Sequence, residues 1–172
     1  NKMDRTGADP ERVERDLREK LGLNIVPIQL NMGAGDGFEG VIDLITMEAV
    51  TFEGDSGEKV VRGPIPEACR ETAEAAHHDM LEAISMFNDE LMEKLLEEET
   101  IDQQMIRETV REAPINRDIV PLMMGSAFKN KGRQPLMNAV CDYLPSPLDR
   151  PTFARDHDNE GSEVPLESDP EA

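Results

Sequence analysis

The chain has 172 residues, 38% of them hydrophobic, which suits one ordinary domain or parts of two rather than a disordered chain. Its formal net charge of −19 and its 3% of aromatic residues argue against direct binding of a nucleic-acid backbone or stacking on bases. No apolar run reaches the roughly 20 residues that a membrane helix needs, so we expect a cytoplasmic protein without membrane contact.

A helix is predicted to begin directly after Asp9. Asp9 can accept a hydrogen bond from the first-turn amides, and Pro10 fits the first helical position. Because the helix starts after Asp9, Asn1 to Asp4 lie in the loop that precedes it. Gly22 can end the helix. The apolar face of this helix would consist of Val13, Leu17 and Leu21.

The next segments have the composition of strands. Residues 24–31 and 40–52 are rich in β-branched residues, and a turn cluster at 53–57 leads to a third strand at 58–62, which together predict a small antiparallel sheet. The glycines of 33–37 invite comparison with a phosphate loop. That segment lacks the Lys-Ser/Thr pair and a following helix, which favours a flexible connection.

Three helices are then predicted, over 66–87, over 88–96, and from Thr100, where Gln103 completes a capping box. Residues 67–112 hold fourteen acidic and four basic side chains, about half of the net charge. This acidic helical layer is either a solvated face or a surface for a basic partner. His77 and His78 project about 100° apart on a helix, so we expect no metal site there.

The end of the chain predicts a strand, a loop and a helix. The apolar run before Gly125 indicates a short buried strand, and a polar loop follows it. Beyond residue 148 the composition is that of a linker or the start of another domain. The predicted helix ends at the Pro-Ser-Pro sequence, and its apolar side would consist of Leu136, Ala139, Val140, Tyr143 and Leu144.

The loops at the two ends of the chain carry groups that suit recognition of a guanine base. The Asp4 carboxylate can accept two hydrogen bonds from the ring N–H and exocyclic amine of guanine, whereas adenine leaves the charge unpaired. The stem of Lys2 can lie on the base, and Asn1 can tie the loop to neighbouring backbone. The Ser126 hydroxyl and nearby N–H groups could donate to the guanine carbonyl. Alone, the first loop could equally be a turn that caps a helix.

Three stretches together resemble elongation factor G, a family of bacterial translational GTPases: "NKMDRTGAD", "VPIQL" followed by "GVIDLI", and "GSAFKNKGRQPLMNAVCDYLPSP". The resemblance fades only after about residue 150. Arg133 departs from the small apolar residue that is usual in the family. The resemblance implies that the loops are the fourth and fifth guanine-nucleotide motifs, with Asn1, Lys2, Met3, Asp4, Ser126, Ala127 and Phe128 as nucleotide-binding residues.

The same resemblance implies an α/β fold, the C-terminal part of a P-loop GTPase domain with an inserted α+β subdomain. Residues 1–22 and 119–147 would belong to the GTPase domain, and 23–118 would form the insertion of strands and helices. Residues 148–172 would be a linker and the start of a β-barrel domain.

The family couples hydrolysis of GTP, bound with Mg²⁺, to movement of transfer RNA and messenger RNA through the ribosome. Its inserted subdomain contacts the ribosomal stalk protein, so the acidic helical layer is the implied contact surface. These 172 residues contain no GxxxxGK[ST] phosphate loop. We therefore expect a segment of a longer GTPase that binds GTP or GDP only weakly by itself and has no catalytic residue of its own.

Two alternatives stay open at this point. One is a sister translational GTPase, such as a ribosomal-protection protein, a release-factor GTPase or a recycling paralogue. The other is a stand-alone acidic interaction module without nucleotide chemistry.

Overall fold

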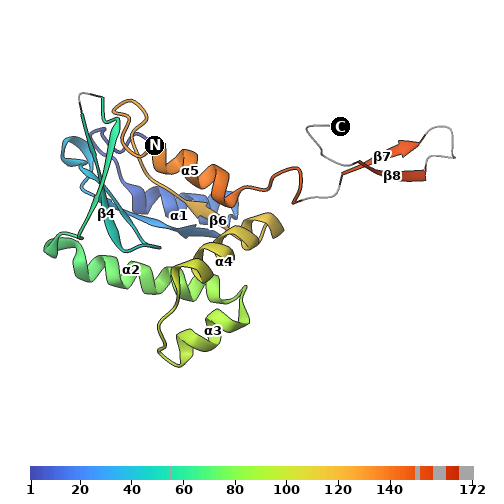
Figure 1. Ribbon diagram of the computed structural model, residues 1–172. Helices are drawn as coiled ribbons and strands as arrows, with labels where there is room; N and C mark the ends of the chain where they lie inside the picture. Colours follow the sequence, from blue (N-terminus) through green and yellow to red (C-terminus); the bar gives the residue numbers. More distant parts are fainter. Residues whose placement is uncertain (55, 150–151, 157–161, 167–172) are drawn as a thin grey trace.

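Residues 25–32 contribute strands to two different sheets. The computed structural model describes residues 1–54, 56–149, 152–156 and 162–166. An antiparallel sheet has the strand order β2-β3-β4-β5, and β1 pairs in parallel with β6 (Figure 1). The strands are β1 (Ile25–Pro27), β2 (Gln29–Met32), β3 (Gly40–Asp43), β4 (Glu48–Glu53), β5 (Lys59–Gly63) and β6 (Val120–Leu122).

Helices cover the strands from several sides. In Figure 1, α2 runs below the strands and α5 above them, while α3 and α4 extend the lower layer. A short 3₁₀ turn, η1 (Gly35–Gly37), connects β2 and β3. The helices are α1 (Pro10–Leu21), α2 (Glu67–Ser85), α3 (Asp89–Leu96), α4 (Gln103–Asn116) and α5 (Arg133–Tyr143). None of these described helices combines the length and apolarity needed to cross a bilayer.

Both long strands predicted from the sequence are divided in the structure. Residues 24–31 form β1 and β2, which belong to different sheets and are separated only by Ile28. Residues 40–52 form the hairpin of β3 and β4, because the Asp43 carboxylate accepts hydrogen bonds from the backbone N–H groups of Ile45 and Thr46 and starts a turn. A continuous β-branched pattern does not reveal such a break.

Side-chain caps mark the starts of α1 and α3. The Asp9 carboxylate accepts a hydrogen bond from Arg12 N at 2.9 Å, and Gly22 ends α1 in the left-handed conformation, as predicted. The predicted start at Thr100 is wrong. α4 begins at Gln103, after Asp102 in an extended conformation, and the preceding Ile101 packs against the main core.

Two hydrophobic clusters hold the described elements together. The main core lies between the strands and α2, α3 and α4, and Ile42, Leu44 and Ile84 are among its fully buried members. A second core lies beneath the first loop. It consists of Met3, Phe38, Val41, Val50 and Phe52.

Several residues on the predicted apolar faces are exposed. Helix α1 has no buried residue, and Val13 and Leu21 on its predicted apolar face are both exposed. On α5 only Ala139 and Tyr143 are buried, and the predicted strand at β6 begins with the exposed Val120. The other residues of the predicted apolar side of α5, all exposed, are Leu136, Val140 and Leu144.

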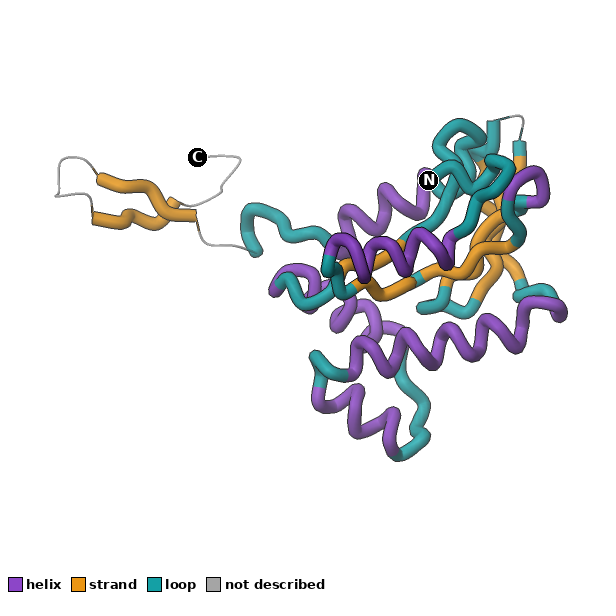
Figure 2. Tube along the Cα trace, turned by 180° about the vertical axis from the view of Figure 1, so that it is seen from behind, coloured by secondary structure: helices purple, strands orange, loops and turns teal. Residues whose placement is uncertain are grey.

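The last described residues form a hairpin of β7 (Thr152–Asp156) and β8 (Ser162–Leu166). Figures 1 and 2 draw it apart from the other elements. Parts of the region predicted as a linker, namely residues 150–151, 157–161 and 167–172, lie outside the described residues. The predicted domain boundaries stay predictions, although β1 from the predicted insertion pairs with β6 from the predicted GTPase part.

Truncation of the main core should be costly. We expect Ile84→Ala to lower the free energy of unfolding by about 2–5 kcal/mol, because Ile84 is fully buried and its removal leaves a cavity. Leu96→Ala is the matched control, since Leu96 is 79% exposed, and should change it by less than about 0.5 kcal/mol. Urea denaturation followed by circular dichroism measures both, and equal losses would contradict this placement of the core.

Candidate functional site

The first loop, residues 1–9, is a sequence of turns that ends at the Asp9 cap. The Asn1 side chain accepts a hydrogen bond from Lys2 N at 2.7 Å, and Arg5 N donates to Lys2 O at 3.1 Å. Lys2 has a φ of 68°, in the left-handed region that non-glycine residues seldom occupy. The loop therefore holds its first four residues in a defined arrangement.

The second loop, residues 125–132, is closed by a short backbone ladder. Ser126 and Lys131 exchange backbone hydrogen bonds of 2.8 and 3.0 Å. A Cβ atom on Gly125 would lie 2.6 Å from Lys131 O, and one on Gly132 would lie 2.8 Å from Met124 O. Both positions require glycine because the two sides of the loop approach each other too closely for a Cβ atom. The sequence motif alone does not reveal this reason.

The two loops meet although about 120 residues separate them in the sequence. Met3 N donates to Gly125 O at 3.2 Å, and Ala127 N donates to the Asn1 side-chain oxygen at 3.0 Å. Asn1 thus ties the first loop to the second, as predicted for its role in binding neighbouring backbone. The structure brings together all seven nucleotide-binding residues predicted from the sequence, at positions 1–4 and 126–128, on these two loops.

Asp4 and Ser126 lie against each other at the junction. Hydrogen bonding from the Ser126 side chain is the largest effect that lowers the pKa of the Asp4 carboxyl, and desolvation opposes it. The positive charges of Lys129 and Arg5 lower this pKa further. The Oδ1 atom of Asp4 is buried and makes no hydrogen bond within the described part of the chain. Asp4 is therefore an ionised carboxylate with acceptor capacity to spare.

Ser126 is enclosed within the junction. The residue is fully buried, and its hydroxyl oxygen accepts a hydrogen bond from Lys129 N at 3.2 Å while the side chain contacts Asp4. In this arrangement Ser126 orients the Asp4 carboxylate, and the predicted donation of its hydroxyl to a guanine carbonyl stays a prediction. Met3 is also buried, in the second core, and acts through its backbone. Lys2 and Ala127 are exposed, as is Phe128 at 89%.

Two hollows border the joined loops. One, of about 320 Å³, is lined by Asn1 to Met3 and the start of α1. The other, of about 150 Å³, is lined by Asn1, Ser126, Ala127 and the start of α5. Asn1 lines both of these hollows and Asp4 lines neither. The single slot between Asp4 and Ser126 that the sequence suggested stays a prediction. No cluster of three potential metal ligands occurs among the described residues.

Sequence reasoning missed one contributor to the site. Gly35, in η1, donates its backbone N–H to Met3 O at 2.8 Å. The segment predicted as a flexible connection thus contains a 3₁₀ turn, Gly35–Gly37, that is hydrogen-bonded to the first loop. Its glycines were the available signal: a Cβ atom on Gly33 would collide with Gly37 O.

A known protein family matches most of the chain. The family described as "Elongation factor Tu GTP binding domain" matches residues 1–146. The chain belongs to this family. That assignment places the two joined loops in a GTP-binding domain and agrees with the α/β fold that the sequence predicted.

Curated relatives carry the name of the family predicted from the sequence. The chain is 53% identical to "Elongation factor G" of Rhodopirellula baltica over 99% of its length and 45% identical to "Elongation factor G 1" of Treponema pallidum over all of it. It covers 24% and 25% of these relatives, so it spans about a quarter of their length. The predicted resemblance to elongation factor G is confirmed.

A solved structure from Thermus thermophilus has the same fold. It is 28% identical in sequence and superposes with a TM-score of 0.71, over 87% of this chain and 23% of that one.

The Asp4–Ser126 contact has a measurable titration signature. Ser126→Ala should raise the pKa of Asp4 toward its ordinary value, because the largest cause of its lowering is removed. A carboxyl with a lowered pKa stabilises the fold above the unfolded pKa and loses this contribution as pH falls through the folded pKa, so the variant should lose less stability on acidification. Carboxyl NMR titration measures the shift. Ser56→Ala, at an exposed turn, is the control, and an unchanged Asp4 pKa in Ser126→Ala would contradict the contact.

Proposed function

We propose that this chain is the guanine-recognising segment of elongation factor G, whose full-length form hydrolyses GTP with Mg²⁺ and drives movement of transfer RNA and messenger RNA on the ribosome. The observation that carries the proposal is the junction of the two loops, where Asp4 and Ser126 meet within a GTP-binding family domain. The relatives named elongation factor G support the translational role. A cytoplasmic location follows from that role.

Asp4 would select guanine by charge and geometry. Its ionised carboxylate offers two acceptor oxygens, which suit the ring N–H and exocyclic amine that guanine presents side by side. Ser126 keeps the carboxylate ionised and oriented. The exposed Lys2 stem and Phe128 ring would flank the base, and the backbone of Ala127 would face its carbonyl.

Binding of the base requires a small rearrangement of the loops. In the structure Ala127 N is engaged by Asn1 and the free oxygen of Asp4 is buried. A base that offers its own donors and acceptor can replace these contacts, because each lost hydrogen bond is exchanged for another. The phosphate and magnesium contacts would come from residues outside this chain.

Exchange of one atom in the Asp4 side chain tests base recognition. In the full-length protein, Asp4→Asn should weaken GDP binding by at least about 100-fold, because an amide nitrogen replaces an acceptor oxygen and faces the amine of guanine. Xanthosine diphosphate, which carries a carbonyl in place of that amine, should bind better than to the unmodified protein. Fluorescence titration with both nucleotides measures the switch. Asp16→Asn on α1 is the control, and an unchanged preference in Asp4→Asn would remove Asp4 from the site.

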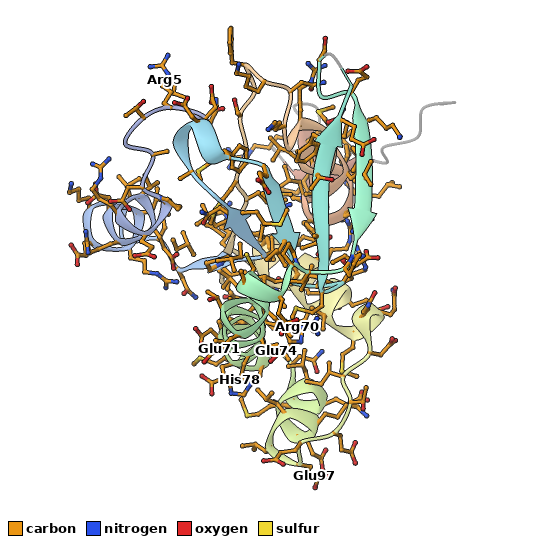
Figure 3. The ribbon with its side chains drawn as sticks, turned by 90° about the vertical axis from the view of Figure 1, so that its left-hand side faces the viewer. Arg5, Arg70, Glu71, Glu74, His78 and Glu97 are labelled. Carbon is orange, nitrogen blue, oxygen red and sulfur yellow. The ribbon has the colours of Figure 1, made fainter. Side chains whose placement is uncertain are left out.

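The acidic helical layer would bind the ribosomal stalk protein. Glu71, Glu74 and His78 lie on one outer side of α2, and Glu97 lies at the far end of α3 (Figure 3). This surface is at the other end of the molecule from Arg5 and the first loop in the same view. A basic partner could therefore dock on the layer without covering the nucleotide.

Charge removal on α2 tests this partner. The double variant Glu71→Gln, Glu74→Gln should weaken binding of the purified stalk protein and flatten its dependence on salt, because long-range attraction to a basic partner decreases. The matched control is Glu11→Gln, Glu19→Gln on α1. Isothermal titration at two salt concentrations measures the difference, and equal weakening by both double variants would place the contact elsewhere.

A further inference from the structure

We propose that Lys131 is a positioning residue for guanine selection, held in place by the turns of the antiparallel sheet. The inference rests on the proposed function, because it concerns the same base-reading loops. Lys131 donates its ammonium to Phe38 O at 2.7 Å, and the ammonium lies 5.9 Å from the centre of the Phe38 ring. Phe38 follows η1 and is buried in the second core.

The bond from Lys131 closes a ring of contacts around Asp4. On one side, Lys131 pairs through its backbone with Ser126, and Ser126 contacts Asp4. On the other side, η1 is closed by the bond from Phe38 N to Gly35 O at 3.1 Å, and Gly35 N donates to the residue before Asp4. The Asp4 carboxylate is thus placed from both loops, and one charge-assisted hydrogen bond joins the two sides.

A second turn of the same sheet supports the loop from another direction. Gly57, in the connection between β4 and β5, is buried, and a Cβ atom there would lie 2.7 Å from Lys129 O. One residue later, Glu58 O accepts a hydrogen bond from the Gln134 side chain at 3.1 Å. The sheet therefore contacts the chain on both sides of Lys131, at Lys129 in the second loop and at Gln134 in the first turn of α5.

The main chemical requirement is a cation at Lys131. The side chain is half-buried, and Phe38 O is buried with its residue, so loss of the ammonium leaves an acceptor without its partner. The loop would then relax away from η1 and carry Ser126 with it. The bidentate geometry that separates guanine from a base lacking the exocyclic amine would be lost first, because it depends most on the position of Asp4.

The experiment measures nucleotide release and selectivity in the full-length protein. Lys131→Met should release GDP about tenfold faster, as expected for one lost charge-assisted hydrogen bond. It should also narrow the preference for GDP over inosine diphosphate, which lacks only the exocyclic amine. Lys131→Arg keeps a donor and should restore most of both properties. Lys59→Met, which removes a cation from the exposed pair with Glu53, should change neither.

Each outcome decides the proposal. Faster release with an unchanged preference would indicate general loosening of the fold and overturn the positioning role, as would unchanged release. Should Lys131→Met fail to fold, Gly57→Ala is measured instead, because it pushes on the same loop without changing charge, and normal release from it would overturn the proposal. The Asp4→Asn variant separates the two levels. If Asp4→Asn does not change the base preference, the proposed function falls. If Asp4→Asn changes the preference but Lys131→Met releases GDP at the normal rate and with the normal selectivity, only this inference is overturned.

Discussion

The hydrogen-bonded junction between the loop that begins the chain and the loop before α5 is the constraint on which the site depends. Two backbone-centred bonds, from Met3 to Gly125 and from Ala127 to Asn1, join segments that are remote in sequence. Closing so long a connection costs conformational entropy that two hydrogen bonds alone do not offset. The cost is met by the cores between the strands and helices of the intervening chain. The middle of the chain is therefore a structural requirement of the junction and not merely an addition to it.

Much of this architecture could be predicted where the signal is local. The Asp9 cap, the Gly22 end of α1 and the Asn88 cap of α3 depend on residues within one turn, and all are present. The pairing of the two loops was predictable from motifs that carry long-range information. In contrast, the break at Ile28 and the hairpin at Asp43 depend on the hydrogen-bond partners of individual backbone groups. The periodicity of the sequence does not specify these partners.

Some contacts at the site depend on burial, which the sequence does not specify. Sequence reasoning assigned Ser126 to the base because a hydroxyl can donate, whereas its contact with Asp4 follows from where the fold buries it. The apolar faces of α1 and α5 could be predicted from periodicity, but their degree of burial could not, since amphipathicity does not specify what covers a helix. The role of Gly35 was hidden because it acts through a backbone N–H, which every residue except proline carries.

Ile28 joins the two sheets without a linker. Its N–H donates to Leu122 O at the end of β6, and its carbonyl accepts from Leu44 N after β3, each at 3.1 Å. These two bonds tie the sheets together at one residue. No loop lies between the two sheets at this point, because Ile28 alone separates β1 from β2. A displacement of the antiparallel sheet by its helical layer would therefore pass directly to the parallel pair of strands.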